Sequence, residues 1–217
     1  MEFNSKLKMN KLIYVSDPLC GWCYGNSSNI LAIKNEFSEV FEFELLMGGM
    51  WLPPNTQVGG SSLTQFMKEH APQMEQTTGQ KVSDAFYDLA NNPNYTFSSL
   101  EGCAASVLVK KLKPEVVFEF ASGVQKLFYQ KGLPLNSMET YKPLLIDLKV
   151  DVDQFEYLWL QEANLNETHE EFNKARHLAN GYPTLLIDLN NQIGKISAGY
   201  FPLEAMQNHL RQLSKSL

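Results

Sequence analysis

The sequence predicts an α/β protein in which the two halves of one mixed unit are separated by an all-α inserted domain. A short apolar, β-rich run at 11–17 leads into a helical pattern and then into an alternating strand at 41–49. Residues 51–178 carry successive helical patterns, and strands return only at 182–200, before a last amphipathic helix. The predicted order is therefore βαβ, helical insertion, ββα, and its first half has the layout that opens a βαβ unit.

We expect residues 10–50 and 179–217 to be the two halves of the mixed unit and residues 51–178 to be the insertion.

Size and charge limit the class of protein and the kinds of partner that this chain can have. The chain has 217 residues, of which 44% are hydrophobic, enough to bury a full core. Its net charge is −6 and it has no basic stripe, so we expect neither nucleic acid nor an anionic membrane surface as a partner. Its apolar stretches are shorter than the roughly 20 residues that a membrane helix needs.

The amino-terminal residues carry no pattern of an export signal. "MEFNSKLKMNKLIYVSD" has positive charges but no apolar region of signal-peptide length and no small-residue cleavage site. We therefore expect a cytoplasmic protein. Residues 1–8 are expected to be a vector-derived leader, with Met9 as a second possible start.

Each half of the mixed unit has its own pattern. In the predicted helix at 26–41 the apolar side chains lie near helical spacing, and the strand that follows ends at two glycines. In the second half, strands at 182–190 and 192–200 flank a turn at Asn190–Asn191, and residues 202–217 form an amphipathic helix.

The insertion is predicted to consist of consecutive helices. They span 61–71, 81–90, 98–113, 114–132, 138–149, 151–164 and 166–180. Their start signals are Ser61, Ser98 or Ser99, Pro114, Asp151 and the capping-box pair Thr168 and Glu171. Gly181 is expected to end the last of them.

Two cysteines, Cys20 and Cys23, stand between the first strand and the first helix. In a reducing compartment such a spaced pair more often has metal-binding or redox work. At a helix N-terminus, unpaired N–H groups and the helix dipole favour a thiolate at Cys20. Cys23 would lie about one turn inside the helix, where it can attack a mixed disulfide. Gly21 is expected to permit the tight turn, and Trp22 to offer an apolar surface beside the sulfur.

A second motif, "GYPTLLID", places Pro183 at the start of a strand, where a proline need not donate to the ladder. If the Tyr182–Pro183 bond is cis, the backbone of Tyr182 could face the sulfurs and pair with an incoming peptide. Most X–Pro bonds are trans, so the sequence leaves the isomer open.

The chain resembles the DsbA-like thiol–disulfide oxidoreductases, which have a thioredoxin fold with a helical domain inserted between its halves. It looks closest to their cytoplasmic FrnE-like branch of protein-disulfide isomerases. The resemblance rests on "YVSDPLCGWCYG", on the order of elements and on "GYPTLLID". It implies that Cys20 is the nucleophile, that Cys23 is the resolving cysteine and that Pro183 is a cis-proline facing them.

Two positions depart from the family pattern. Trp22 stands where the exported DsbA enzymes have a thiolate-stabilising histidine, and Tyr14 stands where family members often have a buried acid. Asp17, Glu42 or Glu44 could replace that acid as a proton acceptor, and the sequence does not choose among them. Thiol exchange is still expected, whereas strong oxidising power is not implied.

Competing interpretations of the cysteines are weaker. A zinc site needs two more suitably spaced ligands, and a disulfide between Cys20 and Cys23 would constrain almost nothing. Cys103 shares a helical face with Leu100 and Val107, so we expect an inert core thiol and no metal site. The four histidines are expected on solvated helix faces or helix ends, without chemistry: His70, His169, His177 and His209.

Several apolar side chains are candidates for a groove that binds unfolded peptide. Met50 and Trp51 are expected to form the substrate groove together with Trp22 and Tyr182, whereas Met47 is as well explained by the core. Aromatic and methionine side chains suit adaptable binding surfaces.

The predicted function is therefore that of a thiol–disulfide oxidoreductase or protein disulfide isomerase acting on protein or peptide thiols and disulfides. No bound cofactor is expected, and glutathione or another redox protein would recycle the cysteine pair. A glutathione-dependent isomerase or transferase of the same superfamily is the alternative, and a peptide-binding module without redox chemistry is a third possibility. The direction of the reaction, the redox potential, the substrates and the oligomeric state stay open.

Overall fold

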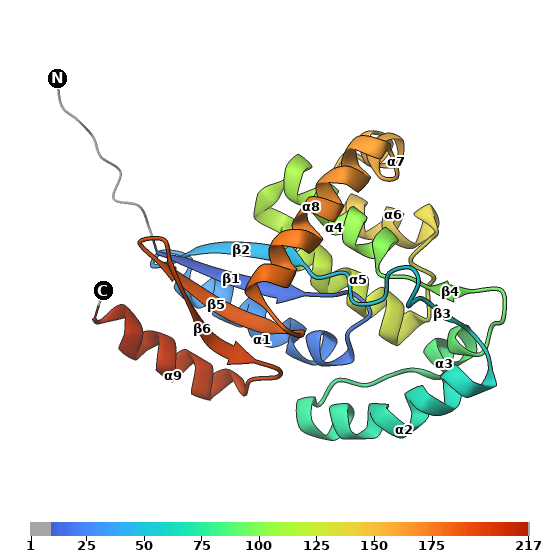
Figure 1. Ribbon diagram of the computed structural model, residues 1–217, viewed down its shortest axis with the longest axis horizontal. Helices are drawn as coiled ribbons and strands as arrows, with labels where there is room; N and C mark the ends of the chain where they lie inside the picture. Colours follow the sequence, from blue (N-terminus) through green and yellow to red (C-terminus); the bar gives the residue numbers. More distant parts are fainter. Residues whose placement is uncertain (1–9, 217) are drawn as a thin grey trace.

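The computed structural model describes residues 10–216, so the expectations about residues 1–8 and Met9 lie outside the described part. The mixed unit is built on a four-stranded sheet in the order β2-β1-β5-β6 (Figure 1). Its elements are β1 Lys11–Ser16, α1 Gly21–Phe37, β2 Glu42–Met47, β5 Thr184–Leu189, β6 Gln192–Ala198 and α9 Leu203–Ser214. β1 is parallel to β2 and antiparallel to β5, and β6 is antiparallel to β5. The two predicted halves share one sheet, which confirms the α/β class.

Side chains along β1 point alternately to the two faces of the sheet, and both faces are covered. Leu12 and Tyr14 pack into a core with residues of α1 and α9. Ile13 and Val15 point to the other face and pack with Ala175 of α8, which spans Glu162–Leu178. Figure 1 shows α8 crossing the sheet on the side opposite α1. A helix of the predicted insertion thus packs directly on the sheet.

Two boundaries of the mixed unit follow from local geometry. α1 begins at Gly21, earlier than the apolar pattern at 26–41 indicates, because Cys20 caps the helix, and it ends at Phe37. The β5–β6 hairpin turns at Asn190 and Asn191, as predicted, with φ of 54° and 68°. Asparagine tolerates this left-handed region better than most residues.

The rest of the chain between β2 and β5 is mostly helical, as predicted. Its helices besides α8 are α2 Ser61–Thr78, α3 Asp84–Ala90, α4 Leu100–Leu112, the 3₁₀ turn η1 Pro114–Val116, α5 Val117–Lys131, α6 Met138–Asp147 and α7 Val152–Leu158. The antiparallel strands β3 Gln57–Val58 and β4 Thr96–Phe97 were not predicted, because two residues carry no periodic signal. An aromatic cluster joins these elements: Phe86 contacts Phe97, Phe128 and Tyr129 at ring-centroid distances of 6.5, 5.2 and 5.0 Å.

Some helix-terminus predictions are confirmed and others are wrong. Asp151 caps α7 by accepting from the Gln154 N–H at 2.9 Å, as predicted. The capping box at Thr168 is wrong, because Thr168 lies inside α8 and its hydroxyl donates to the Asn164 carbonyl at 2.7 Å. The predicted helix at 151–164 is two helices, since Asn164 donates to the Trp159 carbonyl at 2.7 Å and holds the turn between α7 and α8.

Two more predicted helix ends are corrected. α8 ends at Leu178, so Gly181 does not end it, and α2 continues through Pro72 to Thr78. Pro114 does start a helical segment, as the first residue of the 3₁₀ turn before α5. None of the helices in residues 10–216 is long and apolar enough to cross a membrane.

Candidate active site

Cys20 is the N-cap residue of α1 and directly follows the turn after β1. Its backbone is extended, with φ of −84° and ψ of 112°, and its carbonyl accepts from the Tyr24 N–H at 3.0 Å. Its Sγ accepts a hydrogen bond from the Cys23 N–H at 3.2 Å. The sulfur therefore takes the place of an N-cap oxygen, and both the N–H and the helix dipole stabilise negative charge on it.

Cys23 lies inside the first turn of α1 and is almost fully buried, with 1% of its surface exposed. Burial raises the pKa of the Cys23 thiol well above its usual range, and the neighbouring Cys20 raises it further. Cys20 is 5% exposed and lines a surface cavity. The two sulfurs are therefore in different environments: Cys20 borders a surface cavity at the helix terminus, and Cys23 lies behind it and does not line the cavity.

The loop before β5 lies beside the cysteines. The Tyr182–Pro183 bond is cis, as the resemblance implied, and the Cys20 thiol donates to the Tyr182 carbonyl with Sγ 3.5 Å from the oxygen. Sheet register explains the proximity, because Val15 near the end of β1 pairs with Thr184 at the start of β5. Residues 162 positions apart in the chain thus meet at one end of two neighbouring strands.

The side chain of Tyr182 is locked against the end of β2. Its hydroxyl donates to the Gly48 carbonyl at 2.7 Å. A Cβ added at Gly48 would lie 2.2 Å from the Tyr182 ring, so the close approach requires glycine. This contact fixes the orientation of the loop that presents the Tyr182 carbonyl to Cys20.

The expectation that Gly21 permits a tight turn is wrong, because its backbone conformation and surroundings do not require glycine. It lies in α1 without a positive φ, and a Cβ there would have its nearest contact at 3.9 Å, the Tyr129 hydroxyl. The turn before α1 is held instead by hydrogen bonds to the Asp17 side chain and to the Leu19 carbonyl.

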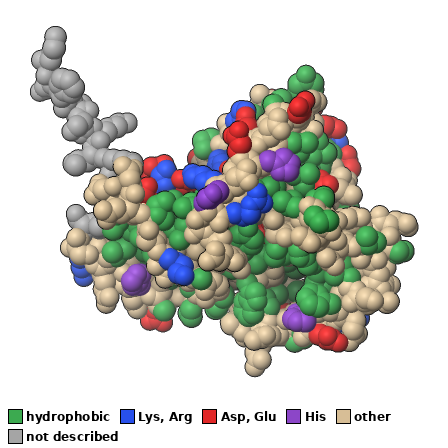
Figure 2. Space-filling view, viewed as in Figure 1, with side chains coloured by type: hydrophobic (Ala, Val, Ile, Leu, Met, Phe, Trp, Pro, Cys, Tyr) green, Lys and Arg blue, Asp and Glu red, His purple; other side chains and the backbone are tan. Residues whose placement is uncertain are grey.

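A mainly apolar cavity of about 370 Å³ opens beside Cys20; we call it the active-site cavity. The predicted groove residues Trp22, Met50, Trp51 and Tyr182 all line it. The other lining residues are Leu19, Cys20, Gly21, Phe66, Met67, His70, Ala71, Met74, Val82, Phe86 and Tyr129. Figure 2 shows hydrophobic side chains gathered on this face of the molecule, over α2 and the neighbouring start of α1. Met47 does not line the cavity and is core, with 2% of its surface exposed.

Asp17 is the one of the three candidate acids that lies near the cysteines. It is fully buried, and its carboxylate accepts from the backbone N–H groups of Leu19 at 2.9 Å and Met50 at 2.7 Å. Glu42 and Glu44 lie at the opposite end of β2, where both pair with Lys11, at 3.5 and 3.0 Å. Burial raises the pKa of the Asp17 carboxyl, although its hydrogen bonds oppose the shift.

Cys103 has the buried position that was expected of it and also a polar contact that was not. Its thiol is fully buried in the core cluster that includes Leu12 and Tyr14 of β1, and it donates to the Asp17 carboxylate over 3.8 Å. Burial, followed by the charge of Asp17, raises the pKa of this thiol well above its usual range. A thiol held protonated in this way is unreactive.

Three supporting residues of the site come from the insertion and were missed in the sequence. Ser99 donates to the Asp17 carboxylate at 2.9 Å, and Gln125 donates to the Asp17 carbonyl at 3.2 Å. Tyr129 donates to the Leu19 carbonyl at 2.7 Å, directly before Cys20. Serines, glutamines and tyrosines in helical patterns carry no signal of such long-range contacts, so only the tertiary structure shows them.

The histidines do not form a metal site with the cysteines. Within residues 10–216 no group of three or more His, Cys, Asp or Glu side chains is placed to hold a metal ion. His70 alone of the four lines the active-site cavity, where its ring lies 4.2 Å from that of Phe66. Its Nδ1 lies 2.8 Å from the Phe66 carbonyl.

Comparisons with known proteins place the fold. No family model and no curated protein matches the sequence. Among solved structures, a Nitrosomonas europaea protein described provisionally as a protein disulfide isomerase matches with a TM-score of 0.81 and 23% identity, over 96% of this chain and 99% of that one. The cytosolic disulfide reductase DsbM from Pseudomonas aeruginosa matches with a TM-score of 0.79 and 22% identity, over 95% and 100%.

Two further structures extend the comparison. DsbM with glutathione (GSH) matches with a TM-score of 0.76 and 23% identity, over 94% of this chain and 99% of that one. 2-Hydroxychromene-2-carboxylate isomerase matches with a TM-score of 0.63 and 13% identity, over 94% and 96%. At these identities the matches establish the fold. The chain has the DsbA-like thioredoxin fold with a helical insertion, as the resemblance implied.

Proposed function

We propose that this protein is a thiol–disulfide oxidoreductase in which Cys20 is the nucleophile and Cys23 the resolving cysteine. The observation that carries the proposal is the difference between the two sulfurs. Cys20 caps α1, accepts the Cys23 N–H and borders the active-site cavity, while Cys23 is shielded one turn inside. A reactive thiol at a helix N-terminus with a second thiol behind it is the arrangement that two-step exchange needs.

In the first step the Cys20 thiolate attacks one sulfur of a substrate disulfide. The substrate S–S bond breaks, a Cys20–substrate disulfide forms, and the other substrate sulfur leaves as a thiolate that takes a proton from water. Because a thiolate has no proton, Cys20 no longer donates to the Tyr182 carbonyl. That carbonyl is then free to accept an N–H from the substrate backbone.

In the second step Cys23 loses its proton and attacks the Cys20 sulfur. The mixed disulfide breaks, the substrate leaves as a thiol, and a Cys20–Cys23 disulfide remains, so two electrons have passed to the substrate. Two glutathione molecules, or one dithiol protein, reduce the pair again and leave as a disulfide. The same steps in reverse oxidise a dithiol, and repeated capture and release rearranges incorrect pairs.

The similar structures support both the activity and a thiol as recycling partner. One is described provisionally as a protein disulfide isomerase, and another is a cytosolic disulfide reductase solved with glutathione. We propose the same class of reaction for this chain, with glutathione as recycling thiol and the cytosol as its compartment. Both extensions rest on fold similarity to these structures.

A glutathione-dependent isomerase is the second candidate, favoured by the match to 2-hydroxychromene-2-carboxylate isomerase. Such an enzyme needs one group to position glutathione and no resolving thiol. The variant Cys23→Ser separates the two functions. Isomerase or transferase activity should survive the substitution, whereas turnover of disulfides should fall sharply and a trapped mixed disulfide should accumulate.

The test is a redox titration in graded glutathione buffers, after which the protein is unfolded in excess alkylating reagent, so that buried thiols are also modified, and analysed by mass. Cys20 and Cys23 should lose their modifications together, and the midpoint then assigns the pair to reductants, isomerases or oxidants. Cys103→Ala is the matched control, because this buried thiol should take no part in the transition. If both cysteines stay reactive at every glutathione ratio, the oxidoreductase proposal fails and the isomerase proposal gains.

A further inference from the structure

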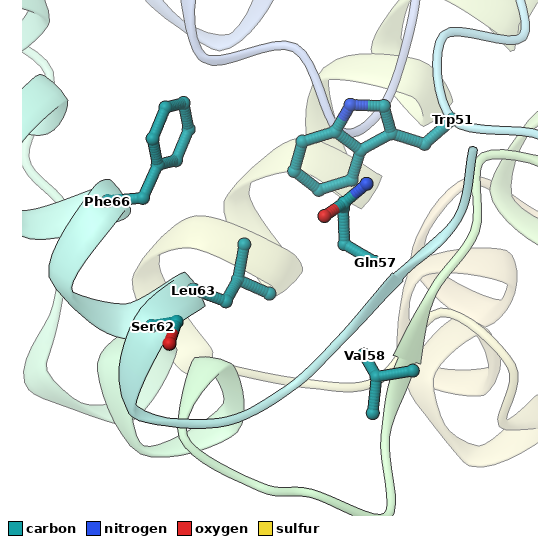
Figure 3. Close-up of a pocket in the computed structure, with 6 residues that line it drawn as sticks. All are labelled: Trp51, Gln57, Val58, Ser62, Leu63 and Phe66. Atoms are coloured by element: carbon teal, nitrogen blue, oxygen red, sulfur yellow. The ribbon is translucent and has the colours of Figure 1, made fainter.

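A second hollow adjoins the active-site cavity. It has a volume of about 460 Å³ and is lined by Trp51, Gln57, Val58, Ser62, Leu63 and Phe66; we call it the distal hollow. Figure 3 shows Trp51 and Phe66 on opposite sides of this space, with Leu63 between them. Trp51 and Phe66 also line the active-site cavity. The two spaces therefore adjoin at Trp51 and Phe66.

The walls of the distal hollow carry large apolar side chains that are exposed to solvent. Val58 is 61% exposed and Phe66 is 47% exposed, although both are large hydrophobic side chains. Single exposed apolar residues are ordinary, but two of them around one hollow next to a reactive thiol indicate a binding surface.

The wall formed by Trp51 is held by the same network that holds the active-site turn. The Trp51 N–H donates to the Ser99 hydroxyl at 3.0 Å, and the Ser99 N–H donates to the Trp51 carbonyl at 2.8 Å. Ser99 in turn donates to the Asp17 carboxylate. These hydrogen bonds hold the position of Trp51 relative to the turn that carries Cys20. A site that selects substrates by the residues near their cysteine requires such a defined position.

The charge of the lining points to one class of occupant. Among the described residues that line either space, none is Asp, Glu, Lys or Arg, and His70 is the one basic side chain. Glutathione carries two carboxylates and an ammonium group and has no bulky apolar side chain. It finds no lysine or arginine partner in this lining, and it leaves the distal hollow empty.

We propose that the distal hollow is a specificity subsite for polypeptide substrates, a proposal that rests on the proposed oxidoreductase function. It takes one bulky apolar side chain, aromatic or aliphatic, that lies a few residues from the cysteine bonded to Cys20. The substrates are then incompletely folded chains, because a folded protein buries both its apolar side chains and its disulfides. Glutathione serves in recycling and not as the preferred substrate.

The test uses peptides with a single cysteine joined in a disulfide to the coloured thiol thionitrobenzoate. A phenylalanine, or a serine as reference, is moved one residue at a time along each side of the cysteine. The same disulfide of N-acetylcysteine amide, which has no neighbouring residues, measures the thiol chemistry alone. The pre-reduced protein supplies the two electrons in a single turnover, and the rate at which it releases the coloured thiol gives the second-order rate constant, equivalent to kcat/KM, for each compound.

At one or two positions phenylalanine should raise kcat/KM about tenfold over serine, as the burial of a large apolar side chain predicts. Val58→Asp should abolish that gain, and Val58→Thr, which keeps the shape of the side chain, should reduce it. Ile146→Asp is the matched control, since Ile146 is 66% exposed on α6 and lines neither space. It should leave the phenylalanine preference unchanged.

Two results overturn the proposal. One is a phenylalanine series that is flat while the N-acetylcysteine compound still turns over. The other is a preference that survives Val58→Asp. Failure of every compound, including the N-acetylcysteine reference, instead refutes the oxidoreductase function on which the proposal rests.

Discussion

Replacing Asp17 should weaken the active-site turn and its link to the insertion at once. Both carboxylate oxygens accept hydrogen bonds inside the protein: one from the Leu19 N–H and the Ser99 hydroxyl, the other from the Met50 N–H and the Cys103 thiol. In Asp17→Asn one of these oxygens becomes an NH₂ group, which faces a backbone N–H and cannot accept from it.

The loss of stability expected for each variant follows from the number of hydrogen-bond donors that it leaves without an acceptor. A buried donor without a partner costs about 1–3 kcal/mol, so Asp17→Asn, with one backbone N–H affected, should lower the free energy of unfolding by about 1–3 kcal/mol. Asp17→Ala leaves both backbone N–H groups without the carboxylate and should cost about 2–6 kcal/mol. Ser99→Ala removes the hydroxyl that donates to Asp17 and accepts the Trp51 N–H, so it leaves that N–H without its acceptor and should cost about 1–3 kcal/mol.

The difference in stability between the wild type and Asp17→Asn should change with pH in one direction. Burial raises the pKa of Asp17 in the folded protein, so its contribution to stability is fully present below the unfolded-state pKa and is lost as the pH rises through the folded-state pKa. Asp17→Asn has no such titration. The stability advantage of the wild type over Asp17→Asn should therefore be largest in acid and shrink towards neutral pH.

Urea unfolding of the reduced proteins, followed by circular dichroism at several pH values, measures these quantities. Using the difference between wild type and Asp17→Asn cancels the titration of all other groups that the two proteins share. Equal stability of the two proteins at neutral pH, or a gap that widens as the pH rises, would refute this account of Asp17.

Three further predictions concern other parts of the site. Tyr182→Phe removes the hydrogen bond to the Gly48 carbonyl and should lower the free energy of unfolding by about 0.5–1.5 kcal/mol. Gly48→Ala should lower it further and slow disulfide turnover, because the added Cβ would lie 2.2 Å from the Tyr182 ring. Burial raises the pKa of Cys23, so iodoacetamide should modify Cys23 slowly in the folded reduced protein and rapidly after unfolding. In the folded protein the rate should rise about tenfold for each unit of pH, because only the thiolate reacts. Rapid modification that does not depend on pH would contradict the burial of Cys23. Glu171 accepts the Met47 N–H at 2.8 Å and pairs with a lysine of α4. Glu171→Ala should therefore lower the free energy of unfolding, measured in urea, by about 1–3 kcal/mol. An unchanged unfolding midpoint would show that this link between α8 and β2 is dispensable.

The sequence by itself determined what depends on neighbours along the chain. The alternation of residues 11–16 predicts a strand, and the spacing of Cys20 and Cys23 is that of an N-cap sulfur and the N–H it receives, three residues on. Asn190 and Asn191 likewise predict their turn from their own conformational preference. Even the capping of α7 by Asp151 is a contact over three residues.

Tertiary structure decided every contact that spans the insertion. The sequence left Asp17, Glu42 and Glu44 equal as candidate acids, and only packing placed Asp17 beside Ser99, 82 positions away. The distal hollow is assembled from the loop after β2, from β3 and from the first turns of α2, none of which carries a periodic signal of binding. Local periodicity encodes which face of an element is buried, but which residues meet across that face depends on how the elements are arranged in three dimensions.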